Sequence, residues 1–273
     1  MQRERRAAIA RTRAGADRIG LSRRGCRHDV WLRILSVVGF VAVWQLIAWA
    51  FALPTYLLPT PLETAVALVE DVGIIAGHLV STVVVALSGL GLSVLVGVVV
   101  AVMMSLSRTL GELIYANMVL SQAIPLIALA PLILLWFGFG WTAKILIVVV
   151  VCFFPIAVNT YEGFRTVQRD QLELMASLEA GPWQRYVHLL IPASLPGAVA
   201  GLKIAATYSL IGAVVGEWIG GSKGMGIYMT RVHQSYRTDR MFAAILVVML
   251  TSYLAFQTIS WVGRRLTPWM ERR

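Results

Sequence analysis

The sequence predicts an all-α polytopic membrane protein with about six transmembrane helices and with both termini in the cytoplasm. Composition is the first observation behind this prediction: of the 273 residues, 58% are hydrophobic and only 14% are charged. Soluble domains are about one quarter charged, so this balance argues against one or two soluble domains. It also argues against a disordered chain, which needs low hydrophobicity, and two cysteines are too few for a disulfide scaffold.

Long apolar stretches are the second observation. A helix needs about 20 apolar residues to cross the hydrocarbon core of a bilayer, and six stretches approach or exceed that length. In order they are 34–53, 79–106, 113–136, 145–161, 192–219 and 241–263. The third contains Pro125 and Pro131, which predict a kink within the span. Transmembrane strands would be about ten residues long and alternate in polarity, so helices are predicted throughout.

The position of the positive charge is the third observation. The net charge of +10 is concentrated in the tail 1–30, because nine arginines precede residue 28. A cytoplasmic tail that follows the positive-inside rule explains it, and attraction to anionic lipid is compatible with that. No aromatic or folded module accompanies the tail, which disfavours a nucleic-acid-binding arm. With the tail inside, 19 of the 24 Lys and Arg residues are cytoplasmic. Residues 31–273 are then one transmembrane domain with its core at 79–265.

Segment 54–78, on the outer side, is too long to be a simple turn. Pro61 suits the first turn of a helix, with Thr60 as its N-cap. Leu62, Val66 and Val69 share one face at helical spacing. We therefore expect a helix that lies in the membrane interface.

The loop 163–192, on the cytoplasmic side, predicts two short helices joined by a turn. Asp170 can cap the first helix, with Glu173 three residues later in an approximate capping box. Gly181, in the turn 180–182, tolerates positive φ, and Pro192 is expected to end the second helix. Periodicity alone leaves two interpretations open: an amphipathic loop on the membrane, or a surface presented to a cytoplasmic partner.

This loop resembles the EAA loop of ABC-importer permeases. Glu173 falls on the glutamate of that motif and Pro192 on its proline, with the family's spacing between them. The chain departs from the motif at two places: Leu174 and Met175 replace the paired alanines, and Glu179 replaces the glycine. These departures bear on the geometry of the turn and on the fit to a partner.

Further stretches extend the resemblance over most of 55–265. Stretches that resemble permeases of the nitrate, sulfonate and taurine type are Leu58-Pro59-Thr60-Pro61, the runs 124–132 and 136–140, Phe153-Phe154-Pro155-Ile156 and Asn159-Thr160. The run 208–218 is most similar to the branch for thiamine-pyrimidine precursors and riboflavin.

The resemblance implies a type I permease bundle in the bacterial inner membrane. It implies cytoplasmic ATPase subunits, an extracytoplasmic binding protein and a second permease copy, with a homodimer expected over two permease types. The chain has no G-x-x-x-x-G-K-[ST] pattern, so we expect a non-catalytic subunit without cofactor, with ATP and Mg²⁺ on the partner ATPase. The ATPase-coupling residues carried over from the motif are Glu173, Leu174, Met175, Ala176, Glu179, Ala180, Gly181, Trp183 and Pro192.

Three polar residues within apolar stretches are candidates for the translocation pathway or its gate: Gln122, Asn159 and Glu217. Gln122 and Asn159 could instead satisfy backbone groups freed near prolines. Glu217 could pair with a basic residue such as Lys223 or Arg231 near the outer boundary, where a carboxyl group costs less than at the bilayer centre. Glycines four residues apart, 197 and 201 and then 212, 216 and 220, predict close helix packing, either within one subunit or at a dimer interface.

Two other function classes are weaker. A standalone secondary transporter would need carboxylates in the mid-membrane region and usually an inverted repeat, and neither is evident. A membrane enzyme would need a catalytic set, and the four histidines lie in separate segments without metal-ligand spacing. The substrate is not readable beyond two expected classes, a sulfonate, nitrate or taurine-like anion and a thiamine-pyrimidine or riboflavin-type compound.

Overall fold

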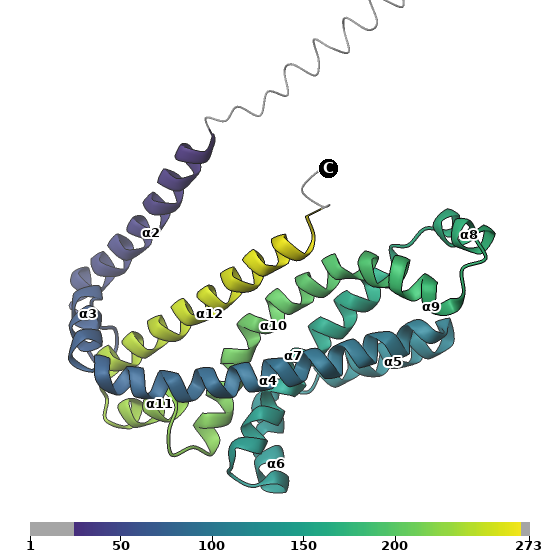
Figure 1. Cartoon of the computed structure of the whole chain (residues 1–273). Coiled ribbons are helices and arrows are strands. Elements are labelled where there is room, and N and C mark those ends of the chain that lie inside the picture. Colours follow the sequence, from purple (N-terminus) through teal and green to yellow (C-terminus); the bar gives the residue numbers. More distant parts are fainter. Residues whose placement is uncertain (1–24, 269–273) are drawn as a thin grey trace, which may run out of the picture. The chain divides into compact units, whose positions relative to one another are not determined.

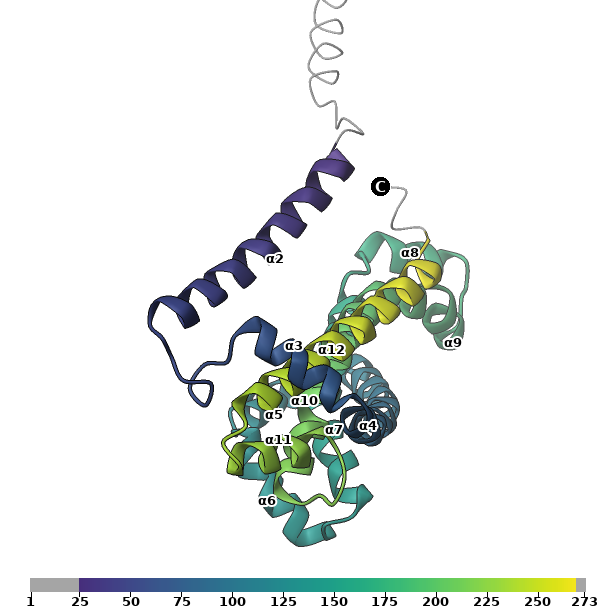
Figure 2. The same ribbon diagram turned by 90° about the vertical axis from the view of Figure 1, so that its left-hand side faces the viewer.

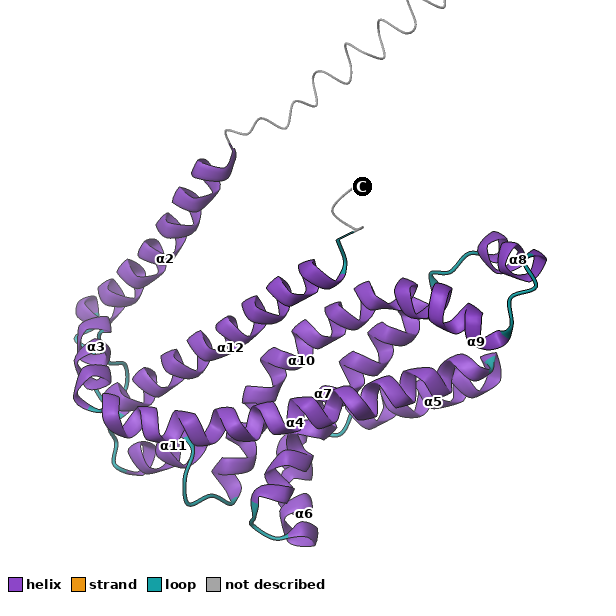
Figure 3. Cartoon of the chain, in the orientation of Figure 1, coloured by secondary structure: helices purple, strands orange, loops and turns teal. Residues whose placement is uncertain are grey.

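The computed structural model describes residues 25–268 and contains only helices and connecting loops over that range (Figure 3). The predicted all-α fold is therefore confirmed for the described part of the chain. Residues 1–24, which form most of the predicted basic tail, and residues 269–273 lie outside it. The chain divides between Pro54 and Thr55 into two compact units, which are taken separately below.

The first unit consists of helix α2 (Gly25–Ala50). Its apolar part, Leu35–Ala50, is shorter than the span predicted for 34–53. Large apolar side chains are exposed all along this part, including Phe40 and Trp49. A helix that is apolar on every side needs a nonpolar environment, so the first span stays a prediction with sound physical support.

The second unit contains four helical segments that are long and apolar enough to cross a membrane. They are α4 (Val72–Leu106), α7 (Trp141–Arg165), the continuous segment Pro182–Ile219 and α12 (Thr238–Leu266). Each begins earlier or ends later than its predicted span. The long segment consists of α9 (Pro182–Arg185), a π-helical turn (Tyr186–Leu190) and α10 (Ile191–Ile219).

The third predicted span is not a single kinked helix. The chain forms α5 (Arg108–Gln122) and α6 (Leu126–Phe137), which meet at 97°. Pro125 has no N–H to donate, and it disfavours helical geometry at Ile124 before it. The helix also starts before residue 113, because Ser107 caps it by accepting a hydrogen bond from the Leu110 N–H at 3.1 Å. The described residues thus hold four spans, or five if this bent pair is one, and the predicted count of six stays a prediction.

Helix α7 forms the centre of the bundle and packs against both α4 and α10. Val148, Cys152 and Ile156 of α7 are buried between these neighbours. Gly197 and Gly201 bring α10 against the backbone of α7, where an added Cβ would overlap the carbonyls of Asn159 and Pro155. This confirms the packing role predicted for these glycines within one subunit.

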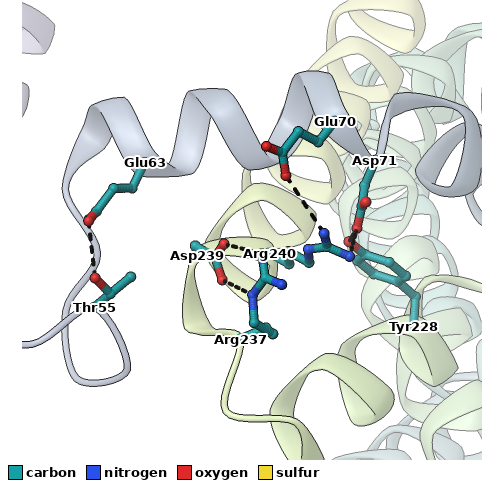
Figure 4. Close-up of polar contacts among 8 residues, drawn as sticks. All are labelled: Thr55, Glu63, Glu70, Asp71, Tyr228, Arg237, Asp239 and Arg240. Atoms are coloured by element: carbon teal, nitrogen blue, oxygen red, sulfur yellow. Dashed lines mark hydrogen bonds and ion pairs between the residues drawn. The ribbon is translucent and has the colours of Figure 1, made fainter.

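Polar contacts fix the short helix α3 (Pro61–Glu70) to the ends of its neighbours (Figure 4). Thr60 caps α3 as predicted: its Oγ1 accepts from the Glu63 N–H at 3.2 Å. Asp71, which joins α3 to α4, is buried and accepts a hydrogen bond from the Tyr228 hydroxyl at 2.7 Å. The same carboxylate forms an ion pair with Arg240 of α12 at 2.9 Å. Burial, together with the bond to Asp71, raises the pKa of Tyr228, so its hydroxyl stays a donor.

The second unit has two distinct ends. Helices α8 (Arg169–Ser177) and α9 lie at one end, and α3 and α11 (Met225–Gln234) lie at the opposite end (Figure 1). Figure 2 faces the end that carries α3 and α11. Helix α11 falls where the sequence predicted only a loop between two spans. Its buried residues, among them Met225, Tyr228 and Val232, pack against α3, α4 and α12.

Candidate functional site

The predicted coupling loop forms two short helices, as expected, but the first begins and the second ends at other residues than predicted. Helix α8 is preceded by Gln168, whose N–H donates to Gln171 Oε1 at 3.1 Å, so Asp170 is not the cap. The residue before the helix needs extended backbone, and Gln168 has it at ψ 153° while Asp170 already lies inside α8. Pro192 does not end the second helix. The Ile191 N–H bonds to the Tyr186 carbonyl five residues back, and this wider turn carries the helix through the proline.

The turn after α8 is a Schellman motif with glutamate in the left-handed position. Ala180 N–H donates to the Met175 carbonyl, and Glu179 N–H donates to the Ala176 carbonyl, both at 3.0 Å. Glu179 has a φ of 54°, whereas Gly181, predicted to use its freedom here, has an ordinary φ of −66°. The motif glycine that this chain lacks therefore corresponds to the position where glycine is favoured by backbone geometry.

We predict that Glu179→Gly strengthens this turn. Left-handed geometry costs a residue with a Cβ about 1–2 kcal/mol, so glycine should increase the protection of the 175–180 amides by roughly fivefold or more. Hydrogen exchange followed by mass spectrometry measures this directly. Gly181→Ala is the matched control, because Gly181 is not left-handed and an added Cβ there would meet only Gln184 Oε1, at the ordinary contact distance of 4.0 Å. Unchanged or reduced protection in Glu179→Gly would show that the strain is absent.

The loop presents a largely unburied surface at its end of the bundle. Leu174, Leu178 and Trp183 are exposed, Trp183 to 77%, and Glu173 is exposed beside them. The base of the loop, unlike this exposed surface, is attached to the bundle. The Tyr186 hydroxyl bonds to Ser105 of α4. An anchored base with an exposed apolar tip, including a large aromatic side chain, is typical of a protein-binding surface.

The remaining coupling residues differ in how far they are exposed. Ala176 is exposed on α8, while Met175 and the turn residues Ala180 and Gly181 are half-buried. Arg185 holds the turn by donating from Nε to the Ala180 carbonyl at 2.9 Å.

The three candidate pathway residues do not lie together. Gln122 is exposed at the end of α5, beside the 97° bend. Asn159 donates from Nδ2 to the Pro155 carbonyl at 2.7 Å, so it bonds backbone near a proline, as one of the two interpretations expected. It also lines a cavity of about 930 Å³ near the base of the coupling loop. The other lining residues are Glu162, Gly163, Thr166, Val167, Gln168, Gln171, Ala193, Pro196 and Gly197.

Glu217 is fully buried at the opposite end of α10, with no exposed surface. Its carboxyl group accepts a hydrogen bond from Thr82 Oγ1 of α4 at 2.9 Å and from the Gly226 N–H at 3.0 Å. The partners are thus a hydroxyl and a backbone amide, in place of the basic residues considered from the sequence. Both distances are typical of well-formed hydrogen bonds.

The Glu217 bond belongs to a set that caps helix α11. Three successive N–H groups at its start, those of Gly224, Met225 and Gly226, donate to His78 Nδ1, Thr82 Oγ1 and Glu217 Oε2. A helix start leaves such amides without intrahelical partners, and it attracts negative charge. These side chains, here named the α11 clamp (His78, Thr82 and Glu217), therefore join α11 to α4 and α10. Sequence reasoning missed it because its members are far apart in the chain.

We predict that Gly224→Ala disrupts the α11 clamp. Gly224 has a φ of 133°, and an added Cβ would overlap the Glu217 carboxyl group. Backbone strain of this kind costs about 1–3 kcal/mol, so the thermal stability of the purified chain should fall. Gly140→Ala is the control, since its φ is −85° and a Cβ there meets open space. Equal melting temperatures for the two variants would contradict the clamp.

Comparison with known proteins decides the family. The model of the family described as "Binding-protein-dependent transport system inner membrane component" matches residues 93–268. The chain belongs to this family. It is a permease subunit of an ABC importer and a membrane protein. The matched range covers the coupling loop and Glu217, while Thr82 and His78 lie before it.

Relatives of this permease are themselves named as transport permease proteins. A "Probable ABC transporter permease protein" of Haemophilus influenzae is 34% identical over 86% of this chain and 96% of its own length. The formylaminopyrimidine transport permease protein ThiX of Halalkalibacterium halodurans is 33% identical, over 85% and 93%. The putative aliphatic sulfonates transport permease SsuC of Bacillus subtilis is 27% identical over 98% of both chains.

Solved structures agree on the fold of this permease. An inward-facing MetNI methionine ABC transporter matches with a TM-score of 0.58 at 21% identity, covering 71% of this chain and 94% of that one. An amino acid ABC transporter matches with the same TM-score at 17% identity, over 74% and 97%. These support the type I permease-like bundle predicted from the sequence. Among residues 25–268, no group of three or more His, Cys, Asp or Glu side chains could hold a metal ion.

Proposed function

We propose that this permease transports a polar, pyrimidine-type heterocycle, using ATP hydrolysed by separate cytoplasmic subunits that dock on the α8–α9 loop. The proposed docking site rests on one observation: the surface around Leu174, Leu178 and Trp183 is exposed, and the base of this loop is bonded to α4. Glu173 lies on α8 beside Leu174, and its negative charge can pair with a basic residue of the partner. An exposed tryptophan is typical of the residues that contribute most to protein association, and exposed apolar side chains grouped around it favour such a contact.

Continuity of the helix supports a coupling role for this loop. The segment Pro182–Ile219 runs without interruption from α9 to the α11 clamp. At 1.5 Å per residue it is about 55 Å long, enough to extend from the cytoplasmic surface across a bilayer. A displacement of α9 by an ATPase would therefore move α10 as a lever, consistent with alternating access by rocking of helix bundles.

The lining of the large cavity supports the substrate class. Among its lining residues are the amides of Asn159, Gln168 and Gln171 and the hydroxyl of Thr166, with no Lys or Arg. The single carboxylate, Glu162, forms an ion pair with Arg165 at 3.3 Å. Amide groups offer donors and acceptors in the pattern that pyrimidines present, whereas an anion would lack a cationic partner. The identity to ThiX, which is higher than to the sulfonate permease, points the same way.

A second permease copy is part of the proposal. Only 11% of the apolar window of α12 is buried within one chain, and α4 also exposes a long series of valines and leucines. Lipid covers such surfaces in part, and a symmetric partner is the usual way to enclose a pathway between them. We expect a homodimer, since two-fold symmetric pairs of one chain are the commonest form of oligomer.

Reconstitution tests the proposal. The permease is placed in proteoliposomes with its partner ATPase and binding protein, and uptake of formylaminopyrimidine and of an alkanesulfonate is compared. We expect ATP-dependent uptake of the pyrimidine only, and no ATP hydrolysis by the purified permease alone. Uptake of the sulfonate would overturn the substrate class, and uptake driven by an ion gradient without ATPase would indicate a secondary transporter.

A further inference from the structure

A second, smaller cavity lies between α10 and α12, near the C-terminal end of α12. Its volume is about 280 Å³. The lining residues are Pro196, Val199, Ala200, Lys203, Gly263, Arg264 and Thr267. The helices approach closely here, because a Cβ on Gly263 would overlap Val199. The cavity thus combines an apolar floor on α10 with two cationic side chains, one from each helix.

Neither cation has an acidic partner among the side chains that the structure describes. The ion pairs of that part of the chain involve Arg108, Arg165, Arg237 and Arg240, and neither Lys203 nor Arg264. Lys203 is half-buried, so its charge is partly removed from water. The neighbouring Arg265 differs, since its guanidinium lies over the Trp261 ring at 4.9 Å. Two unpaired positive charges at the mouth of an apolar groove attract an anion.

An apolar track leads away from this cavity along α10. Ile204 follows Ala200 by four residues, and Tyr208 and Ile211 continue at helical spacing. All three are exposed, although α10 is a membrane-spanning segment. On α12, Ser260 lies one turn before Gly263 on the same face, and its buried hydroxyl has no hydrogen-bond partner. Charge at one end and an apolar track toward the membrane interior match an amphiphile better than a free ion.

We propose that this cavity binds the phosphate headgroup of an anionic phospholipid, held by Lys203 and Arg264, with an acyl chain along Ile204, Tyr208 and Ile211. Each basic residue near an anionic headgroup contributes about fivefold in affinity. Basic cavities between transmembrane helices bind lipid headgroups in this way. The headgroup would lie between α10 and α12, whereas the packing glycines of α10 contact α7.

Native mass spectrometry of the purified full chain tests the site, with phosphatidylglycerol and phosphatidylcholine of identical acyl chains as probes. We expect the wild-type chain to retain phosphatidylglycerol about 25-fold better than phosphatidylcholine, about fivefold for each of the two basic residues. The double variant Lys203→Gln/Arg264→Gln should lose about 25-fold in affinity for phosphatidylglycerol, with unchanged phosphatidylcholine binding. Arg265→Gln, which removes the same charge one residue away, is the matched control and should behave as wild type.

Three results would overturn the proposal. The first is equal retention of the two lipids by the wild-type chain, which would mean that Arg264 only caps the end of α12. The second is an Arg265→Gln variant as impaired as the double variant, which would indicate surface charge without a site. The third is displacement of phosphatidylglycerol by millimolar inorganic phosphate, which would make the cavity a site for a free anion. Melting temperatures of all variants, expected to agree without lipid, exclude misfolding as the cause.

Discussion

Glu173→Arg is expected to release the ATPase subunits from the permease and abolish ATP-dependent transport. Glu173 is exposed on α8, next to the apolar side chains Leu174 and Leu178. Reversing a charge within a desolvated interface costs about 2–5 kcal/mol, which weakens the complex by roughly thirtyfold or more. Co-purification of the ATPase with a tagged permease measures the loss directly, and uptake into proteoliposomes measures its consequence.

Two further variants separate a specific contact from a change in general charge. Glu112→Arg reverses a charge at the same end of the bundle, where Glu112 is exposed and paired with Arg108 on α5. It should leave the complex intact. Glu173→Gln keeps the shape of the side chain and should give an intermediate loss. Wild-type co-purification and transport by Glu173→Arg would remove the docking site from α8, whatever the substrate is.

The fold was largely predictable because the length of each uncharged stretch can be read directly from the sequence. Long uncharged stretches form helices in a membrane. Of the five spans predicted in the second unit, four correspond to long helices and one to a bent pair. The 97° break was not predictable from Pro125 alone, since Pro131 lies inside α6 and Pro155 inside α7 without breaking either helix. Whether a proline kinks or ends a helix depends on which neighbours satisfy the freed backbone groups.

The site was predictable where residues are adjacent in the chain. The coupling loop is such a case, and its Glu179 turn follows from local geometry. The α11 clamp is the opposite case: Thr82 and Glu217 are separated by 135 residues, and the pairing appears only once α4 and α10 are packed. The spacing of Tyr228, Met229 and Val232 was the one available signal for α11, and it is too short to be decisive.

Loss of the α11 clamp is expected to give the largest change in stability. In Glu217→Ala, the Gly226 N–H loses its acceptor in a buried position, while the Thr82 hydroxyl keeps only the His78 carbonyl, at 3.2 Å. One unsatisfied buried donor costs roughly 1–3 kcal/mol, which sets the expected loss of stability. The melting temperature of the purified permease should fall by roughly 2–12 °C, and hydrogen exchange should show the largest increase at the start of α11.

Glu217→Gln distinguishes a clamp from a pathway residue, because glutamine keeps one acceptor oxygen and adds a donor where Gly226 or Thr82 already donates. A clamp predicts a smaller drop in melting temperature than for alanine, with transport falling in parallel with stability. A pathway residue predicts lost transport at an unchanged melting temperature. Glu112→Ala, at an exposed site, should change neither quantity. Thr82→Val removes the hydroxyl that links Glu217 to Met225, so under the clamp it should resemble Glu217→Gln, and a wild-type melting temperature for it would contradict the clamp.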